Sequence, residues 1–358
     1  MIRILIVDDS ATARLLLRMI FERDPELVIV GEARNGREAL ARCVELQPNI
    51  VTMDINMPGM DGYEAIRLIM SESPRPIVVL TAADSSTMLN VSFKAMELGA
   101  LSVLEKPGTK PGTEFNTDIL INEIKTMAGV KVVSRPLWLQ KRSHSPGTLQ
   151  MPAAVAGPRA PADRPGIIGI GVSTGGPPAL QTILLGMAPA LTSAVGCPPI
   201  VIVQHMSRGF IRGLADWLAQ TTRVPCRVIE DGQVLQTGNA YLAPDDRHLV
   251  IRRGGIAALD LSTAIDGHRP SVTALLESLA LSFGSRAIGV LLTGMGQDGA
   301  RGLLAMRNAG GYTIAQDENS SVVYGMPKVA VDIGAAMESL PIDQIAERLL
   351  ILTQNTRL

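Results

Sequence analysis

The stretch "GIIGIGVSTGGPPALQTILLGM", residues 166–187, contains a complete passage from a strand into a helix. Its first seven residues are apolar or glycine, which is typical of a buried strand, and residues 177–187 have helical spacing. The glycines between them permit a sharp turn, because glycine has no Cβ. A strand that turns tightly into a helix is the building unit of parallel α/β sheets, so the stretch predicts that architecture.

The same alternation continues through the C-terminal half of the chain. Strand-like runs are expected at Ile167–Val172, Ile200–Val203, Gln233–Ala243, His248–Arg252 and Ala287–Leu292. Helical spacing is found near 177–187, 210–220, 271–283, 299–309 and 342–353. We therefore expect residues 166–358 to form a Rossmann-like α/β domain with a doubly wound parallel sheet.

Residues 1–128 show a second α/β pattern, separated from the first. Its strand-like runs are Ile2–Val7, Leu27–Gly31, Ile50–Met53, Ile77–Leu80 and Ser102–Leu104. Helical segments lie between them, the first with Ser10 as its expected N-cap. This pattern predicts a five-stranded, flavodoxin-like parallel sheet. Residues 129–165 are rich in Pro, Ala, Arg and Ser without periodicity, so we expect a linker there.

Composition narrows the functional class of the protein. The 358 residues carry a formal net charge of −1 and 3% aromatic side chains, which disfavours binding to nucleic acid. The three cysteines lie far apart in the sequence, so a disulfide framework or a zinc site is not expected. No apolar run approaches the ~18 residues of a membrane span. We expect a cytoplasmic protein that does not insert into membranes.

Acidic residues follow two of the strands expected in residues 1–128. Asp8 and Asp9 come directly after the first strand, and Asp54 follows the third. Three carboxylates at one sheet edge repel one another unless a cation joins them, and a small set of oxygen ligands suits Mg²⁺. Thr81 ends the fourth strand and Lys106 follows the fifth, which adds a hydroxyl and an ammonium suited to a phosphoryl group. A single aspartate at a strand end is more often a solvated turn or a cap, so the hypothesis rests on the whole set.

In these residues the chain resembles the response-regulator receiver family over residues 1 to about 125. The matching motifs are Asp8-Asp9, Asp54 within "MDINMPGMDG", Thr81-Ala82 and Lys106-Pro107. The resemblance implies that Asp54 accepts a phosphoryl group from a histidine kinase. It implies that Lys106 contacts the phosphoryl oxygens and that Thr81 acts as the switch. The magnesium ligands that it implies are Asp9, Asp54 and the backbone carbonyl of Asn56, with Asp8 in support.

Ser173 lies in the glycine-rich turn that follows the strand at residues 167–172. A nucleophilic serine is found in such a strand-turn-helix context, although a serine between glycines is also a common turn residue. His205 ends the next strand-like run and is the best-placed general base of the four histidines. Asp298 follows the strand at residues 287–292 and could orient that base, or it could be a helix N-cap. All three come after strands of one expected sheet and can meet at its edge.

Residues 166 to about 350 resemble the catalytic domain of the chemotaxis protein-glutamate methylesterase (CheB) family. The matching stretches are "GVSTGGP", "VIVQHM", "YLAPDDRHL", "HRPSV", "LLTGMGQDG" and "AQDENSSVVYGMPKVA". The resemblance implies Ser173 as nucleophile, His205 as general base and acid, Asp298 as orienting carboxylate and the Met295 N–H as an oxyanion donor. The geometry of the turn adds the Thr174 N–H as a second donor candidate.

The resemblance also implies what the protein acts on and how it is controlled. The substrates are methylated glutamates, and certain glutamines, in the cytoplasmic domains of chemoreceptors. The phosphodonor is the chemotaxis histidine kinase, and the receiver inhibits hydrolysis until Asp54 is phosphorylated. No metal is expected at the esterase site. An alternative is a phospho-switched binding protein whose hydrolase-like domain is inactive.

Overall fold

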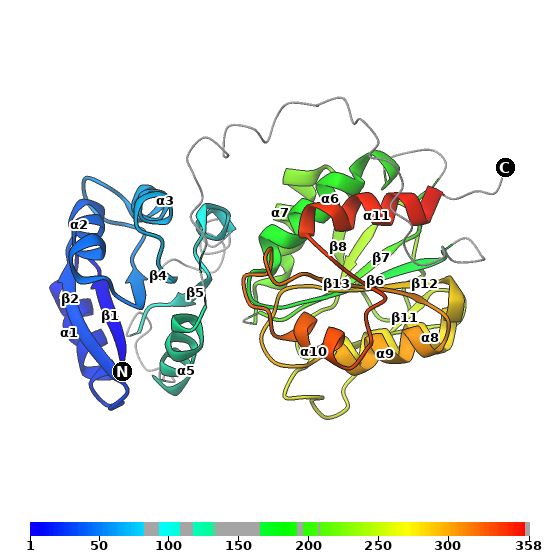
Figure 1. The fold of residues 1–358 in the computed structure, drawn as a ribbon. Helices are drawn as coiled ribbons and strands as arrows, with labels where there is room; N and C mark the ends of the chain where they lie inside the picture. The colour runs from blue at the N-terminus through cyan, green and yellow to red at the C-terminus, as the bar shows by residue number, and fades with distance from the viewer. Residues whose placement is uncertain are drawn as a thin grey trace. The chain divides into compact units, whose positions relative to one another are not determined.

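The computed structural model describes residues 1–81, 93–107, 117–130, 132, 165–191, 196–206 and 208–354. The chain divides into two compact units, residues 1–154 and 155–358 (Figure 1). Most of the linker expected at residues 129–165, including His144, lies outside the described residues, as does Ala82. Each unit is described by itself below.

The first unit contains a five-stranded sheet in the order β2-β1-β3-β4-β5, with every neighbouring pair parallel. The strands are β1 (Ile2–Val7), β2 (Leu27–Ala33), β3 (Ile50–Met53), β4 (Ile77–Thr81) and β5 (Ser102–Glu105). The helices are α1 (Ala11–Phe21), α2 (Gly36–Leu46), α3 (Gly62–Glu72) and α5 (Thr117–Ala128). All five expected strands are therefore confirmed, with small extensions at their carboxyl ends.

Local sequence explains where the helices of this unit begin. Ser10, Asn35 and Asp61 each stand before a helix with extended backbone, and each side chain accepts a hydrogen bond from an N–H in the first turn. The prediction of Ser10 as an N-cap is confirmed by the 3.3 Å bond from the Ala13 N–H to its hydroxyl. The strand-to-helix turns are thus fixed beside the carboxyl ends of the strands.

The second unit contains a seven-stranded sheet in the order β14-β13-β12-β6-β7-β9-β8, again with parallel pairs. Its strands are β6 (Ile167–Val172), β7 (Ile200–Gln204), β8 (Cys226–Val228), β9 (Ala240–Leu242), β12 (Ala287–Leu291), β13 (Tyr312–Gln316) and β14 (Glu338–Leu340). Its helices are α6 (Gly176–Leu191), α7 (Ile211–Thr222), α8 (Val272–Phe283), α9 (Ala300–Asn308), α10 (Met326–Asp332) and α11 (Ile342–Gln354).

Both faces of this sheet are covered by helices. Helices α6, α7 and α11 lie on one face, and α8, α9 and α10 lie on the other (Figure 1). The four strands β6, β7, β12 and β13 are buried along their whole length, as expected for a parallel sheet between two helical layers. Among the described residues, no helix combines the length and apolar character needed to cross a bilayer.

The structure corrects two of the expected strands. Of the run Gln233–Ala243, only Ala240–Leu242 is a strand. The preceding residues form turns, in which Gly232 and Gly238 have φ of +75°, a region that favours glycine. The expected strand His248–Arg252 exists as β10, but it pairs antiparallel with β11 (Ile256–Asp260) outside the main sheet.

Several short elements were missed by the sequence analysis. They are β8, β11, β13, β14 and α10. Strands of three residues, such as β8 and β14, contain too few positions for a period to be recognised. The predicted class, two doubly wound parallel α/β domains, is confirmed.

Candidate functional site

Three central strands bring the candidate catalytic residues to one edge of the second sheet. Strands β12, β6 and β7 are direct neighbours and parallel, so their carboxyl ends meet at that edge. Ser173 follows β6, His205 follows β7, and Asp298 lies in the turn between β12 and α9. Backbone bonds join these turns: the Ser173 N–H donates to the Thr293 carbonyl, and the His205 N–H donates to the Val172 carbonyl, each at 3.0 Å.

His205 and Asp298 are in direct contact. The His205 Nε2 lies 2.9 Å from the Asp298 Oδ2, and the two side chains are 9% and 0% exposed. A buried carboxylate beside an imidazole nitrogen fixes the ring and stabilises it when it gains a proton. The pair therefore has the arrangement of a general base and its orienting acid.

Asp298 is held by the N-terminus of helix α8. Its carboxylate accepts bonds from the Val272 N–H at 2.7 Å, the Thr273 N–H at 3.0 Å and the Ser271 hydroxyl at 2.8 Å. Burial by itself raises the pKa of Asp298, but the hydrogen bonds from His205 and the two amides outweigh it and hold that pKa well below its usual range. Asp298 is therefore a charged acceptor at the positive end of a helix dipole.

The alternative that Asp298 is the N-cap of the helix that follows it is wrong. The helix that follows it, α9, has Gly299 at its N-cap position and no side-chain cap. The aspartate instead accepts N–H groups of α8, a helix from another part of the chain. The residue type at this position does suit a helix N-terminus, but the helix concerned is distant in sequence.

A second grouping links Ser271, His248 and Asp298 by hydrogen bonds. The Ser271 hydroxyl donates to Asp298, and the Ser271 N–H donates to the His248 Nδ1 at 3.1 Å. The remaining nitrogen of His248 donates to the Thr263 carbonyl at 3.1 Å. Ser271 is fully buried and its hydroxyl already serves Asp298, and His248 is 1% exposed. We conclude that this grouping braces Asp298 and cannot receive a substrate.

The turn after β6 leaves N–H groups available around Ser173. Ser173 and Thr174 are partly exposed, and Gly175 has φ of +78°. Within the described part of the chain, neither the Thr174 N–H nor the Met295 N–H donates an internal hydrogen bond. Met295 follows Gly294, and a Cβ built on Gly294 would lie 2.7 Å from the Ser173 Cβ. Free amide donors therefore flank the serine from two separate turns.

Gln204 is a positioning residue that the sequence analysis missed. It is 3% exposed, and its Nε2 donates to the carbonyls of Ser173 and His205, each at 2.8 Å. One side-chain amide thus ties the two turns together. Gly176 makes room for it, because a Cβ there would lie within 1.9 Å of the Gln204 Oε1. A polar residue that ends a fully apolar strand, as in "VIVQHM", is the signal that could have identified it.

Gly294→Ala is expected to slow the covalent labelling of Ser173 by a fluorophosphonate probe about 10²-fold, because displacement of a reacting group by roughly 1 Å has that effect. The added methyl group would meet the Ser173 Cβ at 2.7 Å and the Met326 sulfur at 2.4 Å, so the serine turn must move. Mass spectrometry of the labelled protein over time gives the rate.

Gly166→Ala is the matched control for this substitution. Gly166 precedes β6 at the end remote from Ser173, and its added Cβ would meet the ring of Phe283 at 3.3 Å and the guanidinium of Arg286 at 3.9 Å. We expect nearly unchanged labelling of this variant. Equal rates for Gly294→Ala and the unsubstituted protein would show that Ser173 tolerates a displaced turn.

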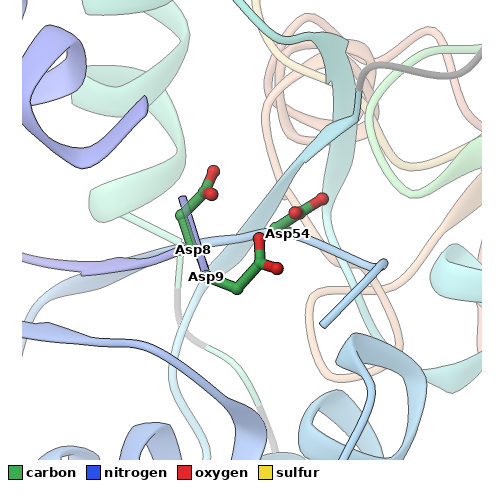
Figure 2. Close-up of side chains that lie close together, drawn as sticks. All are labelled: Asp8, Asp9 and Asp54. Atoms are coloured by element: carbon green, nitrogen blue, oxygen red, sulfur yellow. The ribbon is translucent and has the colours of Figure 1, made fainter. Parts of the chain in front are cut away.

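The first unit gathers three carboxylates at the carboxyl edge of its sheet (Figure 2). Each of Asp8, Asp9 and Asp54 offers an oxygen, and these atoms all lie within 4.8 Å of one another. The Lys106 Nζ lies 2.8 Å from the Asp8 carboxylate and 2.9 Å from the Asp54 carboxylate. One lysine cannot neutralise three carboxylates, so the donor set has the charge and the hard oxygen atoms that suit a divalent cation.

Asp54 is buried, with 4% of its surface exposed, and only Asp8 of the three aspartates is less exposed. Burial raises the pKa of Asp54, and the charge of Asp8 acts in the same direction, whereas the hydrogen bond from Lys106 lowers it. The Asp54 Oδ1 also accepts the Ile55 N–H at 2.8 Å. The second carboxylate oxygen of Asp54 faces Lys106, so an added group there would meet a cation.

The remaining residues implied for this site also lie near it. Thr81 ends β4 and is fully buried, and its carbonyl accepts the Lys106 N–H at 2.9 Å. Asn56 is exposed, and its N–H lies 3.5 Å from the Asp54 Oδ1. Gly62, the first residue of α3, packs against the Asp54 carbonyl so closely that a Cβ would approach it to 2.2 Å.

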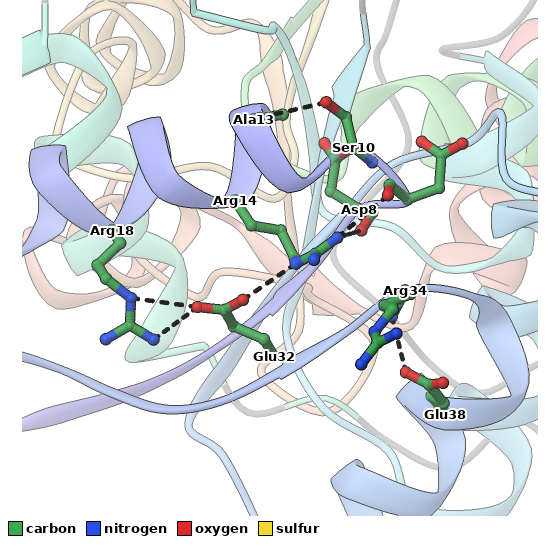
Figure 3. Close-up of polar contacts among 9 residues, drawn as sticks. Asp8, Ser10, Ala13, Arg14, Arg18, Glu32, Arg34 and Glu38 are labelled. Carbon is green, nitrogen blue, oxygen red and sulfur yellow. Dashed lines mark hydrogen bonds and ion pairs between the residues drawn. The ribbon is translucent and has the colours of Figure 1, made fainter.

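A network of arginines behind this site was not foreseen from the sequence (Figure 3). The Arg14 guanidinium donates to the carbonyls of Asp8 at 2.7 Å and Asp9 at 3.1 Å, and to Glu32 at 3.0 Å. Arg18 binds the other oxygen of Glu32 through two nitrogens. The hydrogen bond from Arg18 lowers the pKa of Glu32, which keeps it charged. Helix α1 and strand β2 thus fix the backbone that carries the two aspartates.

Comparisons with known proteins agree with this division into two sites. Residues 4–112 match the response regulator receiver domain, and residues 168–349 match the family described as CheB methylesterase. A protein-glutamate methylesterase/protein-glutamine glutaminase of Myxococcus xanthus is 44% identical over 350 residues, which cover 97% of this chain and 96% of that protein. Another, from Methanospirillum hungatei, is 40% identical over 362 residues and matches over the full length of both chains. The chain therefore belongs to the CheB methylesterase family, with a response-regulator receiver domain ahead of its methylesterase domain.

Proposed function

We propose that this protein hydrolyses glutamate methyl esters and glutamine amides of protein side chains, under the control of its receiver domain. Ser173 is the nucleophile, His205 the general base and acid, and Asp298 the orienting carboxylate. The observation that carries the assignment is the 2.9 Å contact between His205 and the buried Asp298 at the sheet edge where the Ser173 turn also lies. The two full-length relatives support the same substrate class through their names.

In the acylation half of the reaction, Ser173 attacks the side-chain carbonyl of the substrate. The Nε2 of His205 faces Asp298, so Nδ1 is the nitrogen that takes the Ser173 proton, and it is buried without a partner among the described residues. The proton then passes from Nδ1 to the leaving group, which departs as methanol from an ester or as ammonia from an amide. A glutamyl ester of Ser173 remains.

In the deacylation half, water replaces the leaving group. His205 takes a proton from the water as it attacks the glutamyl-serine ester, and it returns that proton to the Ser173 oxygen when the bond breaks. The free N–H groups of Thr174 and Met295 are the donors that stabilise the oxyanion in both halves. The product carries a new glutamate carboxylate.

The proposed substrates are methyl-accepting residues in the cytoplasmic domains of chemoreceptors. The family supports this assignment, and the chemistry is consistent with it, because a partly exposed Ser173 at a sheet edge can reach a side chain of another folded protein. Each hydrolysis adds one negative charge to the receptor, which changes the electrostatics of the region that carries it.

In the receiver, Asp54 is the proposed phosphoryl acceptor and a histidine kinase of the chemotaxis pathway the proposed donor. Asp8, Asp9 and Asp54, together with the carbonyl of Asn56, would hold Mg²⁺, and the ion would supply positive charge for the phosphoryl oxygens. Lys106 would bind those oxygens as a second cation, and Thr81 is the switch residue that responds to them. Phosphorylation relieves an inhibition that the receiver exerts on the esterase.

Asp54→Asn is expected to abolish the rise in hydrolysis that a small phosphodonor causes, while the basal rate stays near that of the unsubstituted protein. The substitution removes the carboxylate that accepts the phosphoryl group but leaves the Ser173 site intact. The measurement is methanol release from a methylated receptor cytoplasmic domain, with full-length protein, Mg²⁺ and acetyl phosphate.

Two controls accompany this experiment. Asp24→Asn removes a surface carboxylate that contacts Lys125 at 3.0 Å on the receiver, and it should respond normally to the phosphodonor. Ser173→Ala should release no methanol with or without phosphodonor. A phosphodonor response that survives in Asp54→Asn would refute the assignment of the acceptor, and methanol release by Ser173→Ala would refute that of the nucleophile.

A further inference from the structure

The ring of His205 has few polar contacts for a catalytic base. Asp298 contacts its Nε2 at 2.9 Å, and both ring nitrogens are buried without a further hydrogen-bond partner among the described residues. The contact at Nε2 does not by itself fix the plane of the ring, because the ring can still turn about the line from its Cβ to Nε2. A second constraint is needed to hold the ring, and with it Nδ1, in one orientation while a proton is exchanged.

His268 supplies such a constraint. Its ring lies parallel to that of His205, with 3.8 Å between the ring centroids and 6° between the planes. Flat rings at this separation are in van der Waals contact over their whole faces. The contact therefore restricts the plane of His205, which the Asp298 contact does not.

The segment that carries His268 is itself braced. The N–H and carbonyl of His268 both pair with Ile265, at 2.9 and 3.1 Å. His248 connects the two ends of the segment, because it binds the Thr263 carbonyl and the Ser271 N–H. Arg269 donates to two carbonyls at the start of the segment, at 3.2 and 3.3 Å. The ring of His268 is thus presented by a fixed loop.

The charge state of His268 suits this role. Burial lowers its pKa below the ordinary histidine value, and the charge on His205 lowers it further, whereas Asp298 and Asp266 raise it. A neutral ring can remain stacked on His205 when His205 becomes an imidazolium. A charged ring in the same place would oppose that protonation by like-charge repulsion.

A pocket of about 590 Å³ lies beside the stack, and His205 and His268 both line it. Its other lining residues include Arg208 and Asp246, which form an exposed ion pair at 2.7 Å. If the ring of His268 were removed, the His205 face that it covers would open toward this polar pocket. Water could then hydrate the base, and the ring of His205 could turn.

We propose that His268 is a positioning residue, whose ring fixes the plane of His205 so that its Nδ1 stays directed at Ser173. The proposal rests on the proposed function, because it assigns His268 a part in that same reaction. His268 touches neither substrate nor Ser173 in this account and acts only through His205.

The test compares His268→Ala with His268→Phe in the full-length, phosphodonor-activated protein. For the alanine variant we expect kcat to fall by about 10–100-fold with KM little changed, since mispositioning of a base affects proton transfer more than binding. The phenylalanine variant keeps a flat ring on His205 and should recover most of the lost kcat. His268→Gln places a smaller planar amide against His205. We expect its kcat to lie between those of the alanine variant and the unsubstituted protein, even where the phenylalanine ring is too large for the site.

Arg208→Ala is the matched control, because it lines the same pocket but makes its contact with Asp246. Its kcat should equal that of the unsubstituted protein. A normal kcat in His268→Ala, or an effect confined to KM, would overturn the proposal. Equal losses in the alanine, glutamine and phenylalanine variants would also overturn it, because the flat ring would then be irrelevant.

The labelling of Ser173 by a fluorophosphonate separates this proposal from the proposed function. The probe needs an activated serine but no receptor. Slower labelling of His268→Ala than of His268→Phe supports the positioning role on its own. Absence of labelling in the unsubstituted protein would overturn the triad, and the positioning role with it.

Discussion

Ser173→Ala is expected to lower the hydrolysis of receptor methyl esters by about 10⁶-fold, the loss that follows removal of a nucleophile from a serine hydrolase triad. Alanine leaves the oxyanion donors in place but removes the oxygen that forms the covalent bond. The substitution should leave the fold unchanged, because the backbone of Ser173 makes the hydrogen bonds that hold the turn. Methanol release measures the loss of hydrolysis, and covalent labelling by a fluorophosphonate measures the loss of the nucleophile.

Ser271→Ala is the decisive comparison, since Ser271 also forms a hydrogen-bonded set with a histidine and Asp298. Its buried hydroxyl stabilises Asp298 and cannot reach a substrate. We expect this variant to be labelled at Ser173 and to lose about 1–3 kcal/mol of stability, the cost of a lost buried hydrogen bond. If Ser271→Ala were not labelled while Ser173→Ala was, the assignment of the nucleophile would have to be reversed.

Asp298→Asn is expected to lower kcat by about 10⁴-fold, as does the equivalent change in a Ser-His-Asp hydrolase. An amide cannot balance the charge of a protonated His205. In the unsubstituted protein the Asp298 carboxylate accepts hydrogen bonds from two backbone amides and a hydroxyl. The asparagine would place its NH₂ group, which is a donor, against some of these donors. We therefore expect a loss of about 2–4 kcal/mol in the free energy of unfolding as well.

The pH dependence of that loss has a definite sign. The pKa of Asp298 is held well below its usual range in the folded protein. Its carboxylate therefore stabilises the fold at every pH above the pKa that Asp298 has in the unfolded chain. Protonation at lower pH removes this contribution. The difference in unfolding free energy between Asp298→Asn and its parent should be constant near neutral pH and should narrow below about pH 4, the unfolded pKa of an aspartate.

Calorimetry of the second unit, with and without the substitution, measures this difference. Asp260→Asn is a suitable control, since the Asp260 carboxylate accepts the N–H and the hydroxyl of Ser262 in a local turn at the end of strand β11. Its smaller effect would show that the helix contacts of Asp298 matter. A difference that grows as the pH falls would contradict the depressed pKa.

Much of both sites was predictable from the sequence because parallel sheets align strand ends. The positions of Ser173 and His205 after β6 and β7 follow from short apolar runs that a single sequence reveals. The three receiver aspartates follow from the same rule, and the structure gathers them within 4.8 Å. That Ser173, His205 and Asp298 act together in catalysis stays a prediction until the variants are measured.

The rest depended on contacts between segments that no local pattern reports. The stacking of His268 on His205 requires the turn before α8 to reach the end of β7. The hydrogen bonds from Arg14 to the carbonyls of Asp8 and Asp9 require helix α1 to pack against the end of the strand that precedes it, β1. Such residues look like ordinary surface positions in a sequence, because their roles are set by partners elsewhere in the chain.

The pairing of β6 with β12 has a consequence for synthesis of the protein. Ser173 leaves the ribosome well before β12, Thr293 and Asp298 have been synthesised. A nascent chain therefore contains the serine without the strand that pairs with β6 and without the carbonyl that its N–H contacts. The receiver, complete by the end of α5, can fold while the rest is still being made. A chain interrupted between α5 and β12 therefore contains the whole receiver but lacks Asp298 and the strand that precedes it.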